Sequence, residues 1–455
     1  MTKKVLALVL TTALTFSLAG CGSTDQEQVS ANVDQQVEAT DNGPVELTVW
    51  GSAEDSTLLK KQVDNFLKEY DGQAQFQIKV EAVEEEDCKD AVLSDMSKAA
   101  DVFIFRNKQL APLVAAGALS AVQVPDMVEL EVSAKAFERA SFQKELYAYP
   151  MATEGGYVLF FNKEFVTAQE AGGSIDSILY KTETLEKLYA MDLSDPELIY
   201  HFWAGGDLYI RVSEDGTHNE STFNHMGGTY HCDYIMQGLV DVDYSTGFAS
   251  MTVEEALEAA KTDDVVVFLA DSEWYDEIKA IWGDNCGVTK IPPLIVQNGQ
   301  MNLSTELDYR MVGVNAYSDH VDWAHKLASY LTNEESQKLR LKENGDRPCN
   351  KAVASSTEAT SDPIIKAINA IEGKSFVIDA LPGYEKALVG LAQWILENDF
   401  EPYEDLSDEE SGELIIEAAD RVYNFKPIVP IFQEAILNGT AFEPIEDKGV
   451  SANVQ

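Results

Sequence analysis

The chain has 455 residues, of which 33 are Lys or Arg and 78 are Asp or Glu, and its net charge at pH 7 is −45. A negative field of this size repels nucleic acid and anionic lipid, so both are excluded as partners of the protein surface. Beyond the N-terminal segments described next, about 410 residues remain, which is enough for two or three domains with substantial cores.

The N-terminus is typical of a secretory signal peptide, which we place at residues 1–20. Two lysines precede an apolar run from Val5 to Gly20, and this run is shorter than the roughly 20 residues that a membrane-spanning helix needs. The sequence "LAGC" at 18–21 resembles the bacterial lipobox, in which a lipid is attached to the cysteine. This resemblance implies lipidation of Cys21 and anchoring at the extracellular face of the bacterial cell membrane. The alternative is an ordinary signal peptide followed by a chance cysteine.

A polar segment, residues 21–44, follows the signal. Its residues 22–44 include five acids but no lysine, arginine or aromatic residue. Such a segment cannot bury enough apolar surface to offset the entropy lost on ordering. We therefore expect a disordered tether between the lipid and the folded part of the chain.

Alternating strands and helices begin at residue 45. The stretch "VELTVWG" (45–51) alternates apolar and polar residues and predicts a strand, as does "AQFQIKVEAV" (74–83). Between them, residues 56–72 place their apolar side chains on one helical face. After a short helix, "ADVFIF" (100–105) predicts a buried strand. This order of strands and helices implies a parallel sheet with helices on both faces.

Strands and helices also alternate in the middle of the chain. The apolar runs "YVLFFN" (157–162) and "DVVVFLA" (264–270) predict central strands, and "VDWAHKLASYL" (321–331) predicts an amphipathic helix. From about Asp379 onward helices dominate. The pattern as a whole predicts two α/β lobes with added helices.

Two helix starts carry the signature of a capping box. Thr252 is followed three residues later by Glu255, and Thr332 by Glu335. We expect the second of these helices to end at Gly345.

Signatures of catalysis are weak. The chain has no GxSxG, HExxH or GxGxxG motif, and "GKS" (373–375) has Ile368 where a phosphate-binding loop requires glycine. A glycosidase would need two placed carboxylates, and 78 acids neither single out such a pair nor exclude it. We expect no enzyme activity and no cofactor.

Metal-binding patterns are equally weak. The segment "DVDYSTG" (241–247) begins like a calcium loop, but Thr252 stands where a bidentate glutamate belongs. His225 and His231 are six residues apart, a poor fit to one helix face, so we expect no metal site. Four further cysteines are scattered and predict neither a zinc site nor a disulfide framework, although one disulfide stays open: Cys88, Cys232, Cys286 and Cys349.

Tryptophans give the strongest hint of a ligand. Trp50, Trp203 and Trp274 each adjoin polar residues where a strand is predicted to end, whereas Trp323 lies on the apolar face of a helix and is expected in the core. Open α/β sheets bind ligands at the carboxyl ends of their strands. Aromatic faces beside acids and amides suit the apolar faces and hydroxyl groups of a sugar. For a single tryptophan, a place in the core is the better interpretation, but the three together favour a sugar site.

Four stretches, taken together and in order, resemble the extracellular solute-binding proteins of bacterial sugar ABC importers, the family that includes maltose-binding protein. They are "AADVFIFRNKQLAPLVAAGALSAV" (99–122), "LYAYPMATEGGYVLFFNKEF" (146–165), "VVVFLADSEWYDEIKA" (265–280) with "GVTKIPP" (287–293), and "MVGVNAYSDHVDWAHKLASYLTNEESQKLRL" (311–341). The resemblance implies an α/β fold of the two-lobe periplasmic-binding-protein (Venus flytrap) type II, with a helical C-terminal region.

The resemblance also implies the course of the chain. Residues 45–153 and 308–355 would form the first lobe, and residues 154–307 and 356–445 the second, with a tail at 446–455. Gly155 and Gly156 would supply backbone freedom where the chain first crosses between the lobes, as hinge residues do.

Ligand-binding residues follow by matching this sequence to the family pattern. Those implied are Trp50, Glu54, Phe105, Lys108, Glu154, Phe202, Trp203, Trp274 and Tyr384. The sequence departs from the pattern at Lys108–Gln109, where relatives often carry an acid and a base, and at Asp271–Glu273, which replaces Gly-Pro. An acidic segment, 401–414, has no counterpart in the family.

The function implied is that of a lipid-anchored binding protein. It would capture a sugar, with maltose or maltodextrin favoured by the phrases "VGVNAYS" and "YLTNEE", and deliver it to an ABC permease. Two alternatives stay open. One is a surface lipoprotein that degrades glycans, and the other is the same fold with a polyamine, metal or peptide as ligand.

Overall fold

The computed structural model describes residues 44–213, 217–223, 230–296, 299–378, 380–397, 425 and 428–443. The predicted signal peptide, Cys21, the tether, the acidic segment 401–414 and the tail 446–455 lie outside these residues. Within the described part, no helix is long and apolar enough to cross a membrane.

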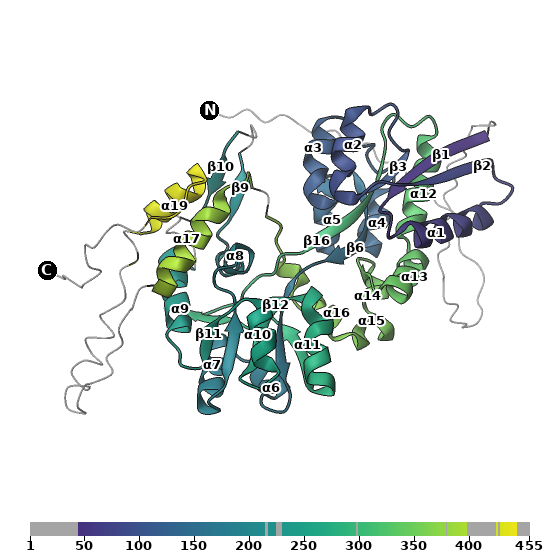
Figure 1. Cartoon of the computed structure of the whole chain (residues 1–455). Coiled ribbons are helices and arrows are strands. Elements are labelled where there is room, and N and C mark those ends of the chain that lie inside the picture. Colours follow the sequence, from purple (N-terminus) through teal and green to yellow (C-terminus); the bar gives the residue numbers. More distant parts are fainter. Residues whose placement is uncertain are drawn as a thin grey trace, which may run out of the picture. The chain divides into compact units, whose positions relative to one another are not determined.

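A six-stranded sheet organises the first lobe, with the strand order β17-β6-β16-β3-β1-β2 (Figure 1). Its strands are β1 (Pro44–Gly51), β2 (Gln75–Ala82), β3 (Val102–Arg106), β6 (Ala148–Glu154), β16 (Asp308–Val314) and β17 (Arg347–Pro348). β1 pairs in parallel with β2 and β3, whereas β16 runs antiparallel to β3 and β6. The three strands predicted between residues 45 and 105 are confirmed, because their apolar patterns decide which faces are buried.

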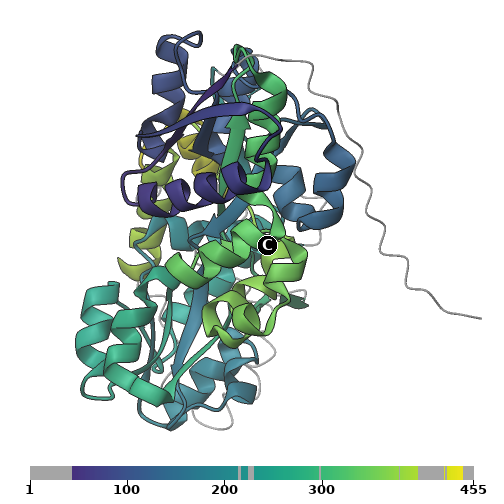
Figure 2. The same ribbon diagram turned by 90° about the vertical axis from the view of Figure 1, so that its right-hand side faces the viewer.

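Helices from two distant parts of the chain cover this sheet. They are α1 (Ser56–Glu69), α2 (Cys88–Ser94), α3 (Leu110–Ala115), α4 (Pro125–Glu131), α5 (Ala134–Arg139), α12 (Val321–Thr332), α13 (Glu334–Asn344) and α14 (Lys351–Ala354). Figure 2 shows the purple N-terminal elements among the green helices that come more than 200 residues later. Trp323 on α12 meets Phe76 of β2 edge-on with ring centroids 4.8 Å apart, so its predicted place in the core is confirmed.

A five-stranded sheet organises the second lobe, with the order β11-β8-β12-β7-β13. Its strands are β7 (Tyr157–Asn162), β8 (Leu188–Met191), β11 (Phe248–Ser250), β12 (Val265–Asp271) and β13 (Cys286–Lys290). β8 is parallel to β11 and β12, and β7 is antiparallel to β12 and β13. The predicted central strands β7 and β12 are confirmed: they are buried on both faces, as their uninterrupted apolar runs require.

The helices around this sheet include the C-terminal ones. They are α6 (Ala168–Ala171), α7 (Ile175–Thr184), α8 (Pro196–Gly205), α9 (Cys232–Asp243), α10 (Val253–Ala260), α11 (Tyr275–Trp282), α15 (Thr357–Ser361), α16 (Pro363–Asn369), α17 (Tyr384–Glu397) and α19 (Val429–Asn438). The described residues also form three short pairs of strands: β4 (Ser141–Phe142) with β5 (Glu145–Leu146), β9 (Ile210–Val212) with β10 (Asn219–Ser221), and β14 (Leu294–Val296) with β15 (Gly299–Met301). α17 and α19 share one apolar core with the second sheet.

Helix capping follows the prediction at one of the two expected sites. Thr252 and Glu255 form the capping box of α10. The box predicted at Thr332 is wrong, because Asn333 caps α13 instead and accepts a hydrogen bond from the backbone N–H of Ser336 at 2.8 Å. The Thr332 hydroxyl donates back to the Ala328 carbonyl of α12. Gly345 ends α13 in the left-handed conformation, as predicted.

The chain passes from the first sheet to the second through Gly155 and Gly156. Their φ angles are +65° and +104°, values that glycine adopts readily and other residues rarely do. A Cβ atom at Gly156 would lie 2.7 Å from Leu307 and 2.8 Å from Ile368. The chain returns through residues 305–307, where the N–H of Leu307 donates to the Phe376 carbonyl at 3.1 Å. Gly156 therefore packs directly against the second passage.

We predict that Gly156→Ala destabilises the protein by about 1–3 kcal/mol, because it combines backbone strain with a steric clash. Gly373→Ala is the matched control: its φ is not in the left-handed region and no atom lies within 4 Å of an added Cβ. Urea unfolding of both variants checks this. Equal stability of the two variants would contradict the tight crossover.

Candidate functional site

A cavity of about 420 Å³ lies at the carboxyl ends of β8 and β12 in the second lobe. Its lining includes Gly155 of the crossover, Tyr157, Leu198, Val253, Leu269, Trp274, and the five acids Asp192, Asp195, Glu197, Asp271 and Glu273. This is where the parallel strands of an open α/β sheet present a ligand site. Since Gly155 is part of the wall, the cavity reaches the crossover.

Trp274 reaches the cavity from a short 3-10 helix, η3 (Ser272–Trp274), directly after β12. Asp271 starts this turn by accepting a hydrogen bond from the Glu273 backbone N–H at 2.9 Å. Trp274 is half-buried and lines the cavity. An aromatic residue thus follows two acids, Asp271 and Glu273, that line the same cavity.

The carboxylates of the cavity are arranged by local capping and by one tyrosine. Asp195 caps α8 by accepting from the Glu197 N–H at 2.9 Å, and it also accepts from the Tyr157 hydroxyl. Burial raises the pKa of Glu197, and the nearby negative charges of Asp195 and Asp271 raise it further. Burial likewise raises the pKa of Glu273. The wall is thus rich in acceptors for hydroxyl groups and holds no lysine or arginine among the lining residues.

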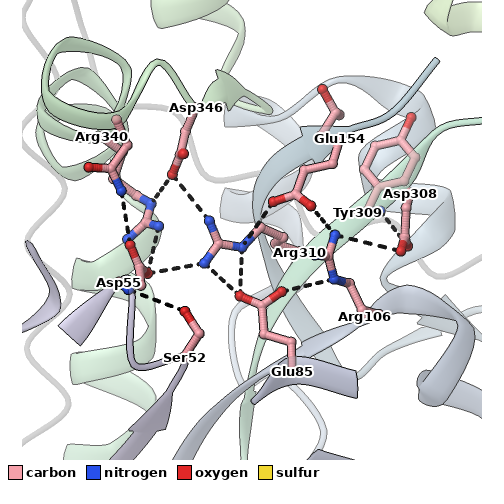
Figure 3. Close-up of polar contacts among 12 residues, drawn as sticks. Ser52, Asp55, Glu85, Arg106, Glu154, Asp308, Tyr309, Arg310, Arg340 and Asp346 are labelled. Carbon is pink, nitrogen blue, oxygen red and sulfur yellow. Dashed lines mark hydrogen bonds and ion pairs between the residues drawn. The ribbon is translucent and has the colours of Figure 1, made fainter. Parts of the chain in front are cut away.

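On the side of the first lobe, the end of the sheet is held by an ionic network around Arg310 (Figure 3). The Arg310 side chain is 7% exposed, and its guanidinium lies 3.1 Å from Asp55, 2.6 Å from Glu85, 3.3 Å from Glu154 and 3.3 Å from Asp346. The four acids lie at or just after the ends of four different elements, namely β1, β2, β6 and α13. One buried cation therefore joins the loops at this edge of the sheet.

Two further arginines complete the network. Arg106, at the end of β3, pairs with Glu154 and with Glu85, the latter at 2.9 Å. Arg340 on α13 pairs with Asp55 and Asp346, each at 2.7 Å. Glu154 is therefore held between Arg106 and Arg310, with its side chain 36% exposed.

An acid with a raised pKa, Glu306, lies in residues 305–307, where the chain returns from the second sheet to the first. Glu306 is partly buried, and burial raises its pKa to about 7. The nearby carboxylates of Glu197 and Asp308 add to this rise, while the backbone N–H of Ile378 stabilises the charged form. A group that changes charge near neutral pH thus lies where the chain returns to the first lobe.

Most residues predicted from the first lobe keep exposed atoms. Trp50 is half-buried at the end of β1 and donates from Nε1 to Glu81 at 3.1 Å. Glu54 is exposed in the following loop. Lys108 is 52% exposed and pairs with Glu86 at 2.9 Å. Whether they touch a ligand stays a prediction.

Three predicted rings have no exposed surface: Phe105, Phe202 and Trp203 are each 0% exposed. The interpretation of Trp203 as a strand-end residue is wrong, because it lies on α8 and stacks on Phe223 with ring centroids 6.1 Å apart. Phe105 packs beside Phe103 within the first sheet. No ligand can reach these three rings in this structure. Tyr384, at the start of α17, is 8% exposed and nearly as inaccessible.

Arg106 and Arg310 are the residues that sequence reasoning missed. Arg310 is a lone charge inside the apolar run "YRMVGV" (309–314), and Arg106 ends the strand "VFIFR" (102–106). A charge inside a buried strand signals an ionic partner, since an unpaired charge would not be buried there. That signal was available in the sequence, although its partners were not.

Within the described residues, no group of histidine, cysteine, aspartate or glutamate could hold a metal ion. His225 lies outside the described residues, and His231 is 3.9 Å from Asp233. Cys88, Cys232, Cys286 and Cys349 are all free and buried, which closes the question of a disulfide among them.

We predict that Arg310→Met destabilises the protein by about 3–5 kcal/mol, because several buried carboxylates lose their counter-ion. Lys61→Met is the control, since Lys61 pairs with Glu343 at the surface, where such a pair contributes about 0–1 kcal/mol. Urea unfolding measures both losses. If the two variants lost similar amounts of unfolding free energy, Arg310 would not be the residue that holds the network.

Comparison with known proteins matches residues 61–367, more than half of the chain, to the family described as bacterial extracellular solute-binding protein. A galactooligosaccharide-binding protein of Bacillus subtilis (strain 168) is 27% identical over 380 residues, which cover 81% of this chain and 86% of that protein. Among solved structures, the maltodextrin binding protein MalE1 from L. casei BL23 has a TM-score of 0.67 at 20% identity, and covers 87% of this chain and 99% of its own. The maltose-binding periplasmic protein MalE from Listeria monocytogenes has a TM-score of 0.63 at 17% identity, with 86% and 97% covered.

These structures share the two-lobe α/β fold, so the predicted fold class is confirmed. The resemblance predicted from four stretches of sequence is confirmed by the match of the family. The chain belongs to the bacterial extracellular solute-binding proteins.

Proposed function

We propose that the protein captures an oligosaccharide between its two lobes and delivers it unchanged to an ABC permease. Maltose or maltodextrin is the ligand favoured by the sequence, and a galacto-oligosaccharide is the competing choice, because the Bacillus subtilis relative is named for that ligand. Lipidation at Cys21 would keep the receptor near its permease and so raise its local concentration there.

The observation that carries this proposal is the ring of Trp274 beside an acid-lined cavity. An aromatic face stacks on the apolar face of a sugar ring, while carboxylates accept hydrogen bonds from its hydroxyl groups. Asp195, Glu197 and Asp271 line the same cavity as Trp274, which supports this role for them. None of the described residues that line the cavity is a lysine or an arginine, so an acidic sugar is a poor fit.

The first lobe would supply the other side of the ligand site. Glu154 directly precedes Gly155, which lines the cavity, and Arg106 holds the Glu154 carboxylate. Trp50, Glu54 and Lys108 are further candidates, since each keeps exposed or half-buried atoms. A ligand that touches both lobes shifts the population toward closed forms.

A polyamine is the second candidate ligand, and the same cavity favours it. Five carboxylates line the cavity, and none of the described lining residues is a lysine or an arginine. Such a wall suits an amine as well as it suits hydroxyl groups. The two ligands differ in their need for Trp274, since a sugar requires a stacking face more than an ammonium group does.

Isothermal titration calorimetry tests the proposal against malto-, galacto-, xylo- and fructo-oligosaccharides, a uronic-acid oligosaccharide and spermidine. We expect saturable heat with one neutral oligosaccharide class and no release of reducing ends over time. Continued product formation would favour a glycan-degrading enzyme. Binding of spermidine alone would favour the polyamine.

In the same assay, Trp274→Ala should weaken oligosaccharide binding by about 1–3 kcal/mol, by analogy with the stacking of other rings on aromatic side chains. Tyr180→Ala is the control, because Tyr180 is an aromatic residue that is 73% exposed on α7 and does not line the cavity. Equal affinity of both variants and of the unsubstituted protein would remove Trp274 from the ligand site.

A further inference from the structure

We propose that Arg347 is a positioning residue for ligand binding, which fixes the turn that carries Trp274 against the crossover. The inference rests on the proposed function, because it assumes that Trp274 contacts the ligand. Arg347 lies on β17, the edge strand of the first sheet, and pairs with Thr153 of β6. It therefore approaches the cavity from the lobe opposite to Trp274.

The guanidinium of Arg347 binds three segments at once. Nε donates to the Thr153 carbonyl at 3.2 Å, Nη2 donates to the Gly155 carbonyl, and Nη1 donates to the Ser272 hydroxyl at 2.9 Å. Thr153 is next to the last residue of β6, Gly155 is in the crossover, and Ser272 begins the turn that holds Trp274. One side chain thus links the two lobes next to Gly155, which lines the cavity.

Ser272 is well suited to receive this link. Its backbone N–H donates to the Gly156 carbonyl at 3.0 Å, and its hydroxyl donates to the Gly155 carbonyl at 3.1 Å while accepting from Arg347. The Asp271 carboxylate, 3.4 Å from the same hydroxyl, is the more distant of the two acceptors that its single proton can reach. Trp274 is two residues further along the same turn.

Each of the three acceptors is met by a different nitrogen of the planar guanidinium. A lysine at this position has a single ammonium group and could reach one or two of the acceptors. The backbone ties the turn to the second sheet, because Asp271 pairs with Tyr157 of β7 and the Ser272 N–H donates to the Gly156 carbonyl. Arg347 adds a link from the first sheet, and so sets the position of Trp274 relative to the first lobe.

A double-mutant cycle on the mature full chain tests the inference. The variants are Arg347→Gln, Arg347→Lys, Ser272→Ala and the double variant Arg347→Gln/Ser272→Ala, titrated with maltotetraose and with galactotriose. We expect roughly tenfold weaker binding for both Arg347 variants, equal to about 1.4 kcal/mol, and a smaller loss for Ser272→Ala. Arg211→Gln is the control, because Arg211 is exposed and pairs with Glu220 on the β9–β10 hairpin.

The cycle separates positioning from general damage to the fold. If Arg347 acts through Ser272, the double variant binds no more weakly than Arg347→Gln alone. Losses that simply add, or an unchanged Kd in Arg347→Gln, would overturn the inference. Should Arg347→Gln fail to fold, Ser272→Ala still decides, since it must weaken binding while its melting temperature stays within a few degrees of the unsubstituted protein.

A measurement without ligand distinguishes this inference from the proposed function. Acrylamide quenching of the Trp274 fluorescence, obtained as the difference from Trp274→Phe, should increase in Arg347→Gln and stay constant in Arg211→Gln. Unchanged quenching in Arg347→Gln would refute the positioning role even if binding is weaker. Increased quenching in a protein that binds neither saccharide would keep the positioning role and refute the sugar as ligand.

Discussion

The first lobe depends on two arginines that face each other on neighbouring strands. Arg106 of β3 and Arg310 of β16 are paired in the register of the sheet, and two adjacent cations in a partly buried place repel each other. Glu85 and Glu154 each form ion pairs with both arginines. These four attractive pairs offset the repulsion between the two guanidinium groups. In a chain with 78 acids and 33 bases, these few buried cations decide how the acidic loops at the edge of the sheet converge.

The same network fixes the place where the chain leaves the first lobe. Glu154 is its last member along β6, and the two crossover glycines follow at once. Two arginines thus hold the Glu154 carboxylate, whereas the next two residues are glycines, whose backbone has more conformational freedom. Rigidity on one side and freedom on the other are what the proposed hinge at Gly155 and Gly156 would require.

Sequence patterns predicted the strands around 45–51, 157–162 and 264–270 well, because burial of apolar faces is a local property. They could not decide whether Trp203 faces a ligand or the core: its neighbours "AGGD" suggest a loop, yet the Asp195 cap and the apolar sequence of α8 bury it. The partners of Arg310 were also hidden, since Asp55 is 255 residues away in the chain. Asn333 replaced Thr332 as the cap of α13 for a short-range reason, because the Thr332 hydroxyl is occupied by the preceding helix.

We propose that a saccharide binds between two lobes that close around it. Small-angle X-ray scattering of the mature chain, with and without a saturating oligosaccharide identified by calorimetry, tests this most directly. We expect a smaller radius of gyration in the saturated protein. A ligand that binds with measurable heat while the radius of gyration stays the same would contradict it.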